Sequence, residues 1–371
     1  MRPTSRARHS GALSAARGHL ENLALAPRPA GSRAERDVRE YCAGILRGIG
    51  FAVSEEPFEY SAAPGRLATP LCGLASIVML GLAGHLGWRG HAVAALACLV
   101  VGGLLLMALV WWLARHGVLA LPWLRERATN LVARRGEPRV WLVAHLDSKS
   151  QPVPIVVRAM GITASLALWL AAMLVSGLQS AGAPLAWVWP VLSVAGVVAG
   201  LPVVASVVRA RSPGALDDAS GVATVLLAAE RLPRECSLGV LLTSAEELGL
   251  AGSRAWVRGQ AAATAINIDG VDDTGKLRII HVARRPGHLA DLLLRVARGA
   301  GLEAASGPLP PGLLVDGVAL ADEGWNVVTL SRGSWRTVAR IHTPLDDLSR
   351  LTGAGVADVA GVVQQALVEL G

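Results

Sequence analysis

The sequence predicts an α/β domain whose mainly parallel, mixed sheet is sandwiched by helices and is interrupted by two transmembrane helical hairpins. Three observations lead to this fold class. From residue 212 onward, strand-like and helix-like segments alternate, as in a sheet covered by helices. Three long uncharged stretches break up the earlier part of the chain. Acidic and imidazole residues recur where predicted strands end, which is where α/β proteins place functional groups.

The composition is that of a protein with both soluble and membrane-embedded parts. Of its 371 residues, 52% are apolar and 17% are charged, and the mean hydropathy is +0.45. The net charge of +7 comes almost entirely from arginine, since Lys149 and Lys276 are the only lysines. Because no basic stripe with interleaved aromatic residues occurs, we expect a basic surface near anionic lipid and no nucleic-acid partner. The four cysteines show no CxxC spacing, which argues against a disulfide framework.

The uncharged stretches predict four membrane-spanning helices in two hairpins. Leu67–Trp88 and Gly90–Ala114 each exceed the roughly 20 residues that a helix needs to cross a hydrocarbon core. Ala159–Val208 carries no charge, and the sequence QSAGAP at 179–184 divides it into two further spans. The expected aromatic belts consist of Trp88, Trp187 and Trp189 on one side and Trp111, Trp112 and Trp123 on the other.

Arginines distinguish the two sides of the predicted spans. The side without soluble segments has Arg89 alone, whereas seven arginines lie close to the span ends on the other side. The positive-inside rule then predicts an integral protein of the cell membrane, with its soluble domain and both termini in the cytoplasm. These seven are Arg66, Arg115, Arg125, Arg127, Arg158, Arg209 and Arg211.

The two hairpins divide one soluble domain into three stretches. Residues 1–66 form its N-terminal part, residues 115–158 carry its first ligand-bearing strand, and residues 209–371 form its main part. The hairpins themselves occupy 67–114 and 159–208. Without them the chain has the length of one ordinary domain.

Periodicity and turn residues predict the elements of the soluble part. The break PRPAGS separates two N-terminal helices, and the second carries apolar residues at helical spacing along one face. Loose alternation predicts the first strand, and short apolar runs bounded by turn residues predict the others. The predicted helices are 13–26, 33–49, 219–231, 250–260, 286–300 and 353–370. The predicted strands are 51–60, 129–134, 139–145, 238–244, 264–268, 277–282 and 326–331.

The stretch VWLVAHLDS (140–148) holds the first candidate metal ligand. An apolar run of strand character ends in His145, and Asp147 follows two residues later on the same face of an extended chain. A carboxylate beside an imidazole sets its tautomer and ring angle for a metal. We therefore expect His145 to bind a metal ion and Asp147 to hold the imidazole.

Two pairs of adjacent carboxylates follow. Asp217 and Asp218 precede a predicted helix in GALDDASG, where capping explains one aspartate and leaves the other for a metal. Glu246 and Glu247 follow a predicted strand in TSAEELGLAGS. Two neighbouring carboxylates raise each other's pKa, and a cation relieves their repulsion. The alternative for the glutamates is a pair of solvated side chains at a helix start.

The remaining candidates are one aspartate and one histidine. Asp269 ends an apolar strand in INIDG, and His342 lies in the loop IHTPLDD. Alone, each has an ordinary explanation as a turn residue or a structural histidine. Together, two histidines, two aspartates and one glutamate supply five ligands, enough for two ions that share an aspartate and keep a place for water. The remaining glutamate is then available as a general base.

In these motifs the sequence resembles the co-catalytic zinc aminopeptidases of metallopeptidase family 28, which also includes relatives of glutamate carboxypeptidase and glutaminyl cyclase. The resemblance covers the soluble part and is carried by PRPAGS, AHLDS, GALDDASGVA, AEELGLAGS, NIDG and IHTPLDD. It implies a zinc aminopeptidase-like fold, two Zn²⁺ per chain and a peptide substrate, although cobalt or manganese also suits such donors. Family members are mostly secreted or face a lumen, whereas the arginines here predict the cytoplasm.

The resemblance also implies a role for each site residue. Glu246 and Asp147 are implied as catalytic residues, the first as general base and the second as partner of His145. Asp316 is implied as a residue at the side of the substrate pocket. The implied metal ligands are His145 and Asp269 for one zinc, Glu247 and His342 for the other, and Asp217 as the bridge.

The sequence therefore predicts a membrane-anchored di-zinc exopeptidase, specifically an aminopeptidase that removes N-terminal residues from peptides. We expect the hairpins to pack into a four-helix bundle and the active site to lie close to the bilayer surface. The alternatives are a glutaminyl cyclase-like enzyme, which works with one zinc, and a catalytically inactive membrane scaffold with a peptidase fold. A transporter is disfavoured because the spans carry no acidic or basic charge. The oligomeric state is left open.

Overall fold

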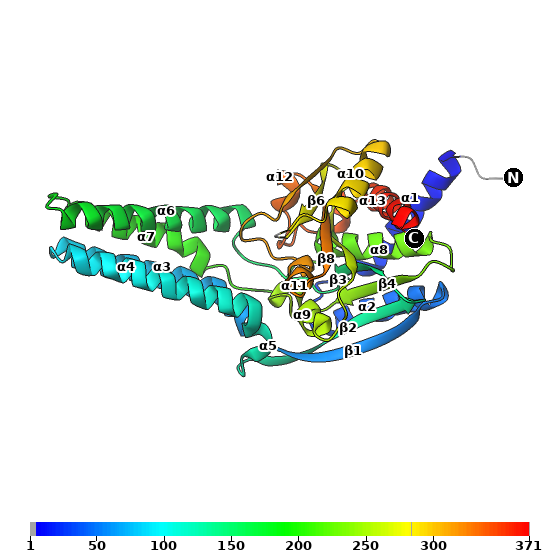
Figure 1. Cartoon of the computed structure of the whole chain (residues 1–371), viewed down its shortest axis with the longest axis horizontal. Coiled ribbons are helices and arrows are strands. Elements are labelled where there is room, and N and C mark those ends of the chain that lie inside the picture. The colour runs from blue at the N-terminus through cyan, green and yellow to red at the C-terminus, as the bar shows by residue number, and fades with distance from the viewer. Residues whose placement is uncertain (1–4, 283, 371) are drawn as a thin grey trace. The chain divides into compact units, whose positions relative to one another are not determined.

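The computed structural model describes residues 5–282 and 284–370 and falls into two compact units (Figure 1). The first, which we call the α/β unit, comprises the chain up to Ser61, Leu124–Ser150 and the chain from Ala210 onward. The second, which we call the helical unit, comprises Ala62–Trp123 and Gln151–Arg209. The helical unit thus interrupts the α/β unit twice.

One eight-stranded sheet forms the centre of the α/β unit, in the order β1-β2-β4-β3-β5-β8-β6-β7. Strands β4, β3, β5 and β8 run parallel, β1 and β2 form an antiparallel ribbon beside β4, and β6 and β7 run opposite to β8. The predicted mixed sheet is therefore confirmed. The strands are β1 Ala52–Ser61, β2 Arg125–Arg135, β3 Val140–His145, β4 Leu238–Thr243, β5 Thr264–Val271, β6 Lys276–His281, β7 Ala304–Pro308 and β8 Asn326–Gly333.

Helices cover both faces of this sheet, because successive side chains of a strand point to opposite faces. Leu142 and Ala144 of β3 pack into one apolar layer, and Trp141 and Val143 pack into the other. The larger layer contains α1 Ser5–Leu23, α2 Arg33–Gly48, α8 Ser220–Glu230, α10 Gly287–Gly299 and α13 Ala354–Leu370. The smaller layer contains α9 Ala251–Val257 and α11 Asp316–Asp322, and a short helix, α12 Trp335–Val338, follows β8.

Two parts of the sheet were not expected. Strand β2 begins at Arg125 rather than at residue 129, because its polar first residues pair with β1 and its Arg127 Nε lies 2.9 Å from Glu59 Oε1. Strand β7 was not predicted because AASGP has small side chains and no apolar alternation. It joins the sheet by pairing with β6.

The carboxyl ends of the four parallel strands meet at one side of the sheet, which we call the carboxyl edge. His145 ends β3 opposite Thr243, the last residue of β4. Because β2 is antiparallel to β4 and β1 is antiparallel to β2, β1 ends and β2 begins at this same edge. The segments after Ser148 and before Ser212 also lie there, since Ser148 Oγ donates to the carbonyl of Ser212. The chain therefore leaves or re-enters the α/β unit at the carboxyl edge in all four of its connections to the helical unit.

The helical unit is a bundle of four apolar helices. Helix α3 packs against α4 and α7, and α6 packs against the same two helices, around buried residues that include Leu80, Leu99 and Trp169. Three described helical stretches, Ala63–Trp88, Ala92–Ala120 and Ile155–Ser180, are long and apolar enough to cross a membrane. Because α7 has 17 residues, the count of four spans stays a prediction. The helices are α3 Ala63–Trp88, α4 Ala92–Trp112, the single turn α5 Val118–Ala120, α6 Ile155–Ser180 and α7 Val188–Val204.

One tryptophan of the predicted aromatic belts lies inside this bundle. Trp189 is 1% exposed, and its indole Nε1 donates to Gln179 Oε1 at 2.7 Å. The prediction that Trp189 faces the bilayer surface is therefore wrong, because a polar partner is available within the bundle. Trp88 and Trp187 are 61% and 71% exposed, as a belt requires.

Helices α3 and α7 approach closely at glycines. A Cβ added at Gly73 would lie 2.8 Å from the backbone nitrogen of Val204 and 2.9 Å from Cβ of Val203, closer than real Cβ contacts. In contrast, a Cβ at Gly81 of the same helix would meet no described atom within 4 Å. The two glycines therefore form a matched pair for testing the packing of the bundle.

We expect Gly73→Ala to lower the thermal unfolding midpoint of the full-length protein in detergent. Overpacking costs about 1–3 kcal/mol, whereas Gly81→Ala should stabilise the helix by about 0.5–1 kcal/mol. Fluorescence-detected unfolding of both variants beside the parent chain measures the difference. Equal midpoints for the two variants would contradict the close packing of α3 against α7.

Candidate metal centre

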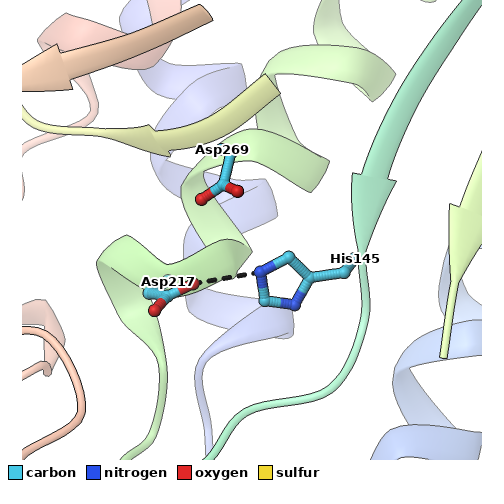
Figure 2. Close-up of side chains that lie close together, drawn as sticks. All are labelled: His145, Asp217 and Asp269. Atoms are coloured by element: carbon cyan, nitrogen blue, oxygen red, sulfur yellow. Dashed lines mark hydrogen bonds and ion pairs between the residues drawn. The ribbon is translucent and has the colours of Figure 1, made fainter. Parts of the chain in front are cut away.

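The seven residues singled out in the sequence lie together at the carboxyl edge. His145 is the last residue of β3, and Asp269 lies in β5 beside an irregularity in the pairing between Ile268 and Val271. Figure 2 shows His145, Asp217 and Asp269 pointing toward one another from three different segments. The others are Asp147, in the loop after β3, Glu246 and Glu247, in the turn after β4, and His342, in the loop after α12.

Asp217 lies between the two histidines. Its Oδ1 is 3.0 Å from His145 Nε2, and its Oδ2 is 3.0 Å from His342 Nε2. Two groups of donor atoms result, in each of which the atoms lie within 4.8 Å of one another. One group is His145, Asp217 and Asp269, and the other is Asp217, Glu247 and His342. A single carboxylate is therefore shared by two metal-ligand clusters.

The second cluster depends on left-handed backbone geometry. His342 has φ 63° and Ala245 has φ 56°. The chain therefore turns sharply just before Glu246 and again at His342 itself. The imidazole Nε2 of His342 lies 3.1 Å from Glu247 Oε1. Glu247 Oε2 is instead 2.6 Å from the ammonium of Lys149, which sequence reasoning had not connected with the site. Lys149 thereby leaves one oxygen of Glu247 for a metal.

Asp147 positions the glutamates as well as the histidine. The Nδ1 of His145 lies 3.0 Å from the backbone carbonyl oxygen of Asp147 and 3.7 Å from its Oδ1. Because a carbonyl only accepts, Nδ1 carries the proton and Nε2 is left to bind a metal. The Asp147 carboxylate accepts the backbone N–H groups of Glu246 and Glu247 at 3.1 and 3.2 Å. It therefore ties the end of β3 to the turn after β4.

Two further aspartates hold the loop of Asp217 in place. Asp218 accepts the backbone N–H groups of Gly221 and Gly270, at 2.9 and 3.0 Å, and that of His145 at 3.3 Å. Asp346 accepts the N–H groups of Leu216 and Asp217 at 2.6 and 3.2 Å. Asp218 and Asp346 both lie in motifs identified in the sequence. No role could be assigned to Asp346, because no local pattern links it to a loop 129 residues earlier.

Arg28 is a third support that sequence reasoning missed. Its side chain is 1% exposed, and its guanidinium donates to the backbone carbonyls of Leu146, Pro213 and Gly214. These carbonyls flank the loops of His145 and Asp217. Burial lowers the pKa of Arg28, against the attraction of Asp346 and Asp147. In the sequence, Arg28 stands out only as an arginine in the PRPAGS break, and arginines are common in surface loops.

Asp316 is placed differently from the expectation. Rather than lying at the side of a pocket, it is 1% exposed and accepts a hydrogen bond from Thr243 Oγ1 at the end of β4. Burial raises the pKa of its carboxyl, against hydrogen bonds from Ser253 and Thr243. Asp316 therefore lies beneath the candidate centre.

The buried carboxylates shift one another's protonation. Burial raises the pKa of Glu246 well above its usual range, and neighbouring Glu247 and Asp269 raise it further. Burial and the charge of Asp217 raise the pKa of Asp269 to about 7. Burial also acts on Glu247, but His342 and Lys149 outweigh it and lower that pKa to about 2. The site thus concentrates negative charge that is only partly balanced.

The pKa values of the two histidines are raised and that of the shared Asp217 is lowered, so all three groups are shifted toward their charged forms. Burial opposes protonation of His145, but Glu246, Asp147 and Asp217 outweigh it and raise its pKa. Burial likewise opposes ionisation of Asp217, yet hydrogen bonds with His145 and His342 hold its pKa well below the usual range. The shared carboxylate therefore lies between two imidazoles whose pKa values are raised.

These donors fit zinc. Neutral imidazole nitrogens and carboxylate oxygens are among its preferred ligands. Oε1 of Glu247 is buried and accepts no hydrogen bond from the described residues, which leaves a lone pair for a cation. The crowding of carboxylates is also the electrostatic condition that a divalent ion relieves.

The fold and these donors define an α/β protein with a metal-ligand centre at the ends of parallel strands. A profile described as Peptidase family M28 matches residues 198–367. That segment holds every candidate ligand except His145. The comparison with curated protein sequences finds no match. The resemblance seen in the motifs is therefore supported by the family profile over the C-terminal part of the chain.

Solved structures share the fold. An aminopeptidase from Aneurinibacillus sp. strain AM-1 superposes with a TM-score of 0.57 at 15% identity, covering 96% of this chain and 93% of that one. A zinc aminopeptidase from Bacillus subtilis gives 0.56 at 15% identity, with 96% and 95% covered. A glutaminyl cyclase from Porphyromonas gingivalis gives 0.54 at 14% identity, with 98% of each chain covered. The fold is thus one that zinc aminopeptidases and glutaminyl cyclases share, and the family profile with these neighbours supports a zinc peptidase.

We expect Asp346→Asn to weaken zinc binding about 10–100-fold, the usual cost of losing a group that orients a ligand. Asparagine offers one acceptor oxygen where Asp346 accepts two backbone N–H groups, so the loop of Asp217 loses support. The neighbouring Asp347, which accepts the N–H of Ser349 and contacts neither the loop of Asp217 nor a candidate ligand among the described hydrogen bonds, provides the control Asp347→Asn. Zinc titration against a chelating dye measures both. Equal affinities in the two variants would show that Asp346 does not orient Asp217.

Proposed function

We propose that the protein is a membrane-anchored di-zinc aminopeptidase that removes N-terminal residues from peptides. The observation that carries this proposal is the shared carboxylate of Asp217, with one oxygen 3.0 Å from each histidine. Two such clusters around a common aspartate suit a pair of ions better than one. The family profile and the zinc aminopeptidase neighbours support the same chemistry.

Each of the five candidate ligands has a place in this proposal. His145 and Asp269 would hold one zinc, Glu247 and His342 would hold the other, and Asp217 would bind both. When bound, the two ions would supply Lewis acidity and acidify a water molecule. Asp147, Asp346 and Arg28 would position the loops that carry the ligands.

Glu246 would move the proton. It belongs to neither donor group, yet its Oε2 lies 4.0 Å from His145 Nε2, and it is adjacent in the chain to Glu247 of the other group. Its backbone is held by Asp147. In this position the carboxylate would accept a proton as water adds to the scissile carbonyl. It would then donate that proton to the leaving amine as the C–N bond breaks.

A glutaminyl cyclase is the second candidate. Solved glutaminyl cyclase structures superpose on this chain over as large a share of each chain as the aminopeptidases do, and one of them gives a TM-score of 0.56. In that reaction the α-amine of an N-terminal glutamine attacks its own side-chain amide and releases ammonia. The two candidates therefore differ in their products and in whether water is consumed.

The parent protein should release free amino acids from aminoacyl-amide substrates, and chelation should abolish this activity. Glu246→Gln should keep its zinc but lose at least about 100-fold in turnover, the lower range for general base catalysis. Glu323→Gln, at an exposed residue outside the site, is the control. Mass spectrometry of the products and zinc analysis of each variant are the measurements. Formation of pyroglutamate from glutaminyl peptides would favour the cyclase. A Glu246→Gln variant that hydrolyses substrate as fast as the parent protein would exclude Glu246 as the base.

We also propose that four helices span the membrane and that the α/β unit faces the cytoplasm. The support is the arginine bias together with the three helices of spanning length. A topology reporter inserted in the turn at 181–184, between α6 and α7, should then report the outer side. A cytoplasmic signal from that position would contradict the orientation without affecting the peptidase proposal.

A further inference from the structure

We propose that exposed apolar side chains around the candidate metal centre dock onto the surface of a lipid bilayer. We call this set the apolar rim. It consists of Leu313, Leu314, Trp335, Val338 and Leu345, which are 44%, 48%, 73%, 41% and 66% exposed. Large apolar side chains this exposed, gathered at one edge of a sheet, are a feature that marks interaction surfaces. The inference goes beyond the peptidase reaction and does not depend on it.

The rim residues share the carboxyl edge with the metal centre. Trp335 and Val338 form the short helix α12, which begins two residues after the end of β8. Leu345 follows His342 by three residues. Leu313 and Leu314 precede Asp316, whose carboxylate accepts a hydrogen bond from Thr243 at the end of β4. Two separate segments, 313–314 and 335–345, therefore bring apolar side chains to one edge.

The opposite edge of the sheet differs. The loops that lead into β3, β4, β5 and β8 comprise 136–139, 231–237, 258–263 and 323–325. Among the residues that the structure describes, none in these loops is an exposed large hydrophobic. The apolar character is therefore a property of the edge with the metal centre and not of loops in general.

The lipid bilayer is the occupant that the chain itself indicates. All four connections to the helical unit start from the carboxyl edge, and three helices of that unit have the length and composition of membrane spans. The connections are short: β1 ends at Ser61 and α3 begins at Ala63. Between His145 and Ile155 the chain reaches at most about 35 Å when fully extended. Because we propose that these helices cross a bilayer, the chain connections leave the carboxyl edge within reach of its surface.

The chemistry of the rim suits the boundary between headgroups and acyl chains. The guanidinium of Arg336 lies over the ring of Trp335, 5.6 Å from its centroid. Tryptophan prefers the headgroup level of a bilayer, and arginine pairs with lipid phosphate. Aliphatic side chains on the neighbouring loops would enter the outer acyl region. The rim therefore combines an anionic-lipid contact with shallow apolar insertion.

Photolabelling of the full-length protein tests this inference. The protein is reconstituted in vesicles of phosphatidylcholine and phosphatidylglycerol that include a phosphatidylcholine with a diazirine in its acyl chain. After irradiation, peptide mapping should find label on segments 313–314 and 335–345 at least about five-fold above segment 258–263. Label on the rim no higher than on 258–263 would overturn the proposal.

Variants make the test specific. Trp335→Ser combined with Leu345→Ser should lower the label on that loop several-fold and leave the label on α3 unchanged. Gln260→Ser, at the opposite edge, should change neither. Because labelling needs no turnover, Glu246→Gln should label like the parent protein. An inactive protein with a labelled rim would therefore refute the peptidase alone, and an active protein with an unlabelled rim would refute the docking alone.

Discussion

The site depends on one carboxylate that faces two imidazoles. Asp217 can point an oxygen at each of His145 and His342 only if its backbone is held from both sides. Asp346 provides one hold by accepting the N–H groups at 216 and 217, and Asp218 provides the other by joining the adjacent turn to β3 and β5. Each of these aspartates is itself buried. The loop is therefore positioned by hydrogen bonds to its backbone as well as by the packing of Ala215, Leu216 and Ala219 in the core.

Burial of so many carboxylates has an electrostatic consequence. Desolvation disfavours the charged form of each, and their mutual repulsion adds to it, so the pKa of Asp269 rises to about 7. Lys149 and Arg28 supply positive charge at the margins of the site, where they contact Glu247 and backbone carbonyls. The centre itself has donors but few cations. Such an arrangement favours the binding of divalent ions.

The sequence predicts the parts of this site that are adjacent to strands. His145 and Glu247 could be found because they follow apolar runs of strand character. Asp217 could be found because helix capping explains only one of two adjacent aspartates. The sheet and most helices follow from periodicity. Asp346 and Arg28 could not, because their partners are backbone groups, which leave no trace in residue type. Lys149 was visible as one of two lysines but its contact with Glu247 requires the fold. Trp189 was misplaced because hydropathy does not reveal that Gln179 offers its indole a partner.

The strand order sets a sequence of events for biosynthesis. β4 lies between β2 and β3, yet it is synthesised after both and after two apolar hairpins. The ribbon of β1 and β2 and the strand β3 therefore leave the ribosome with an open gap between them. Both apolar hairpins are synthesised before β4, the strand that fills this gap. Since His342 is synthesised about 100 residues after β4, the second candidate donor group is incomplete until that residue has been added.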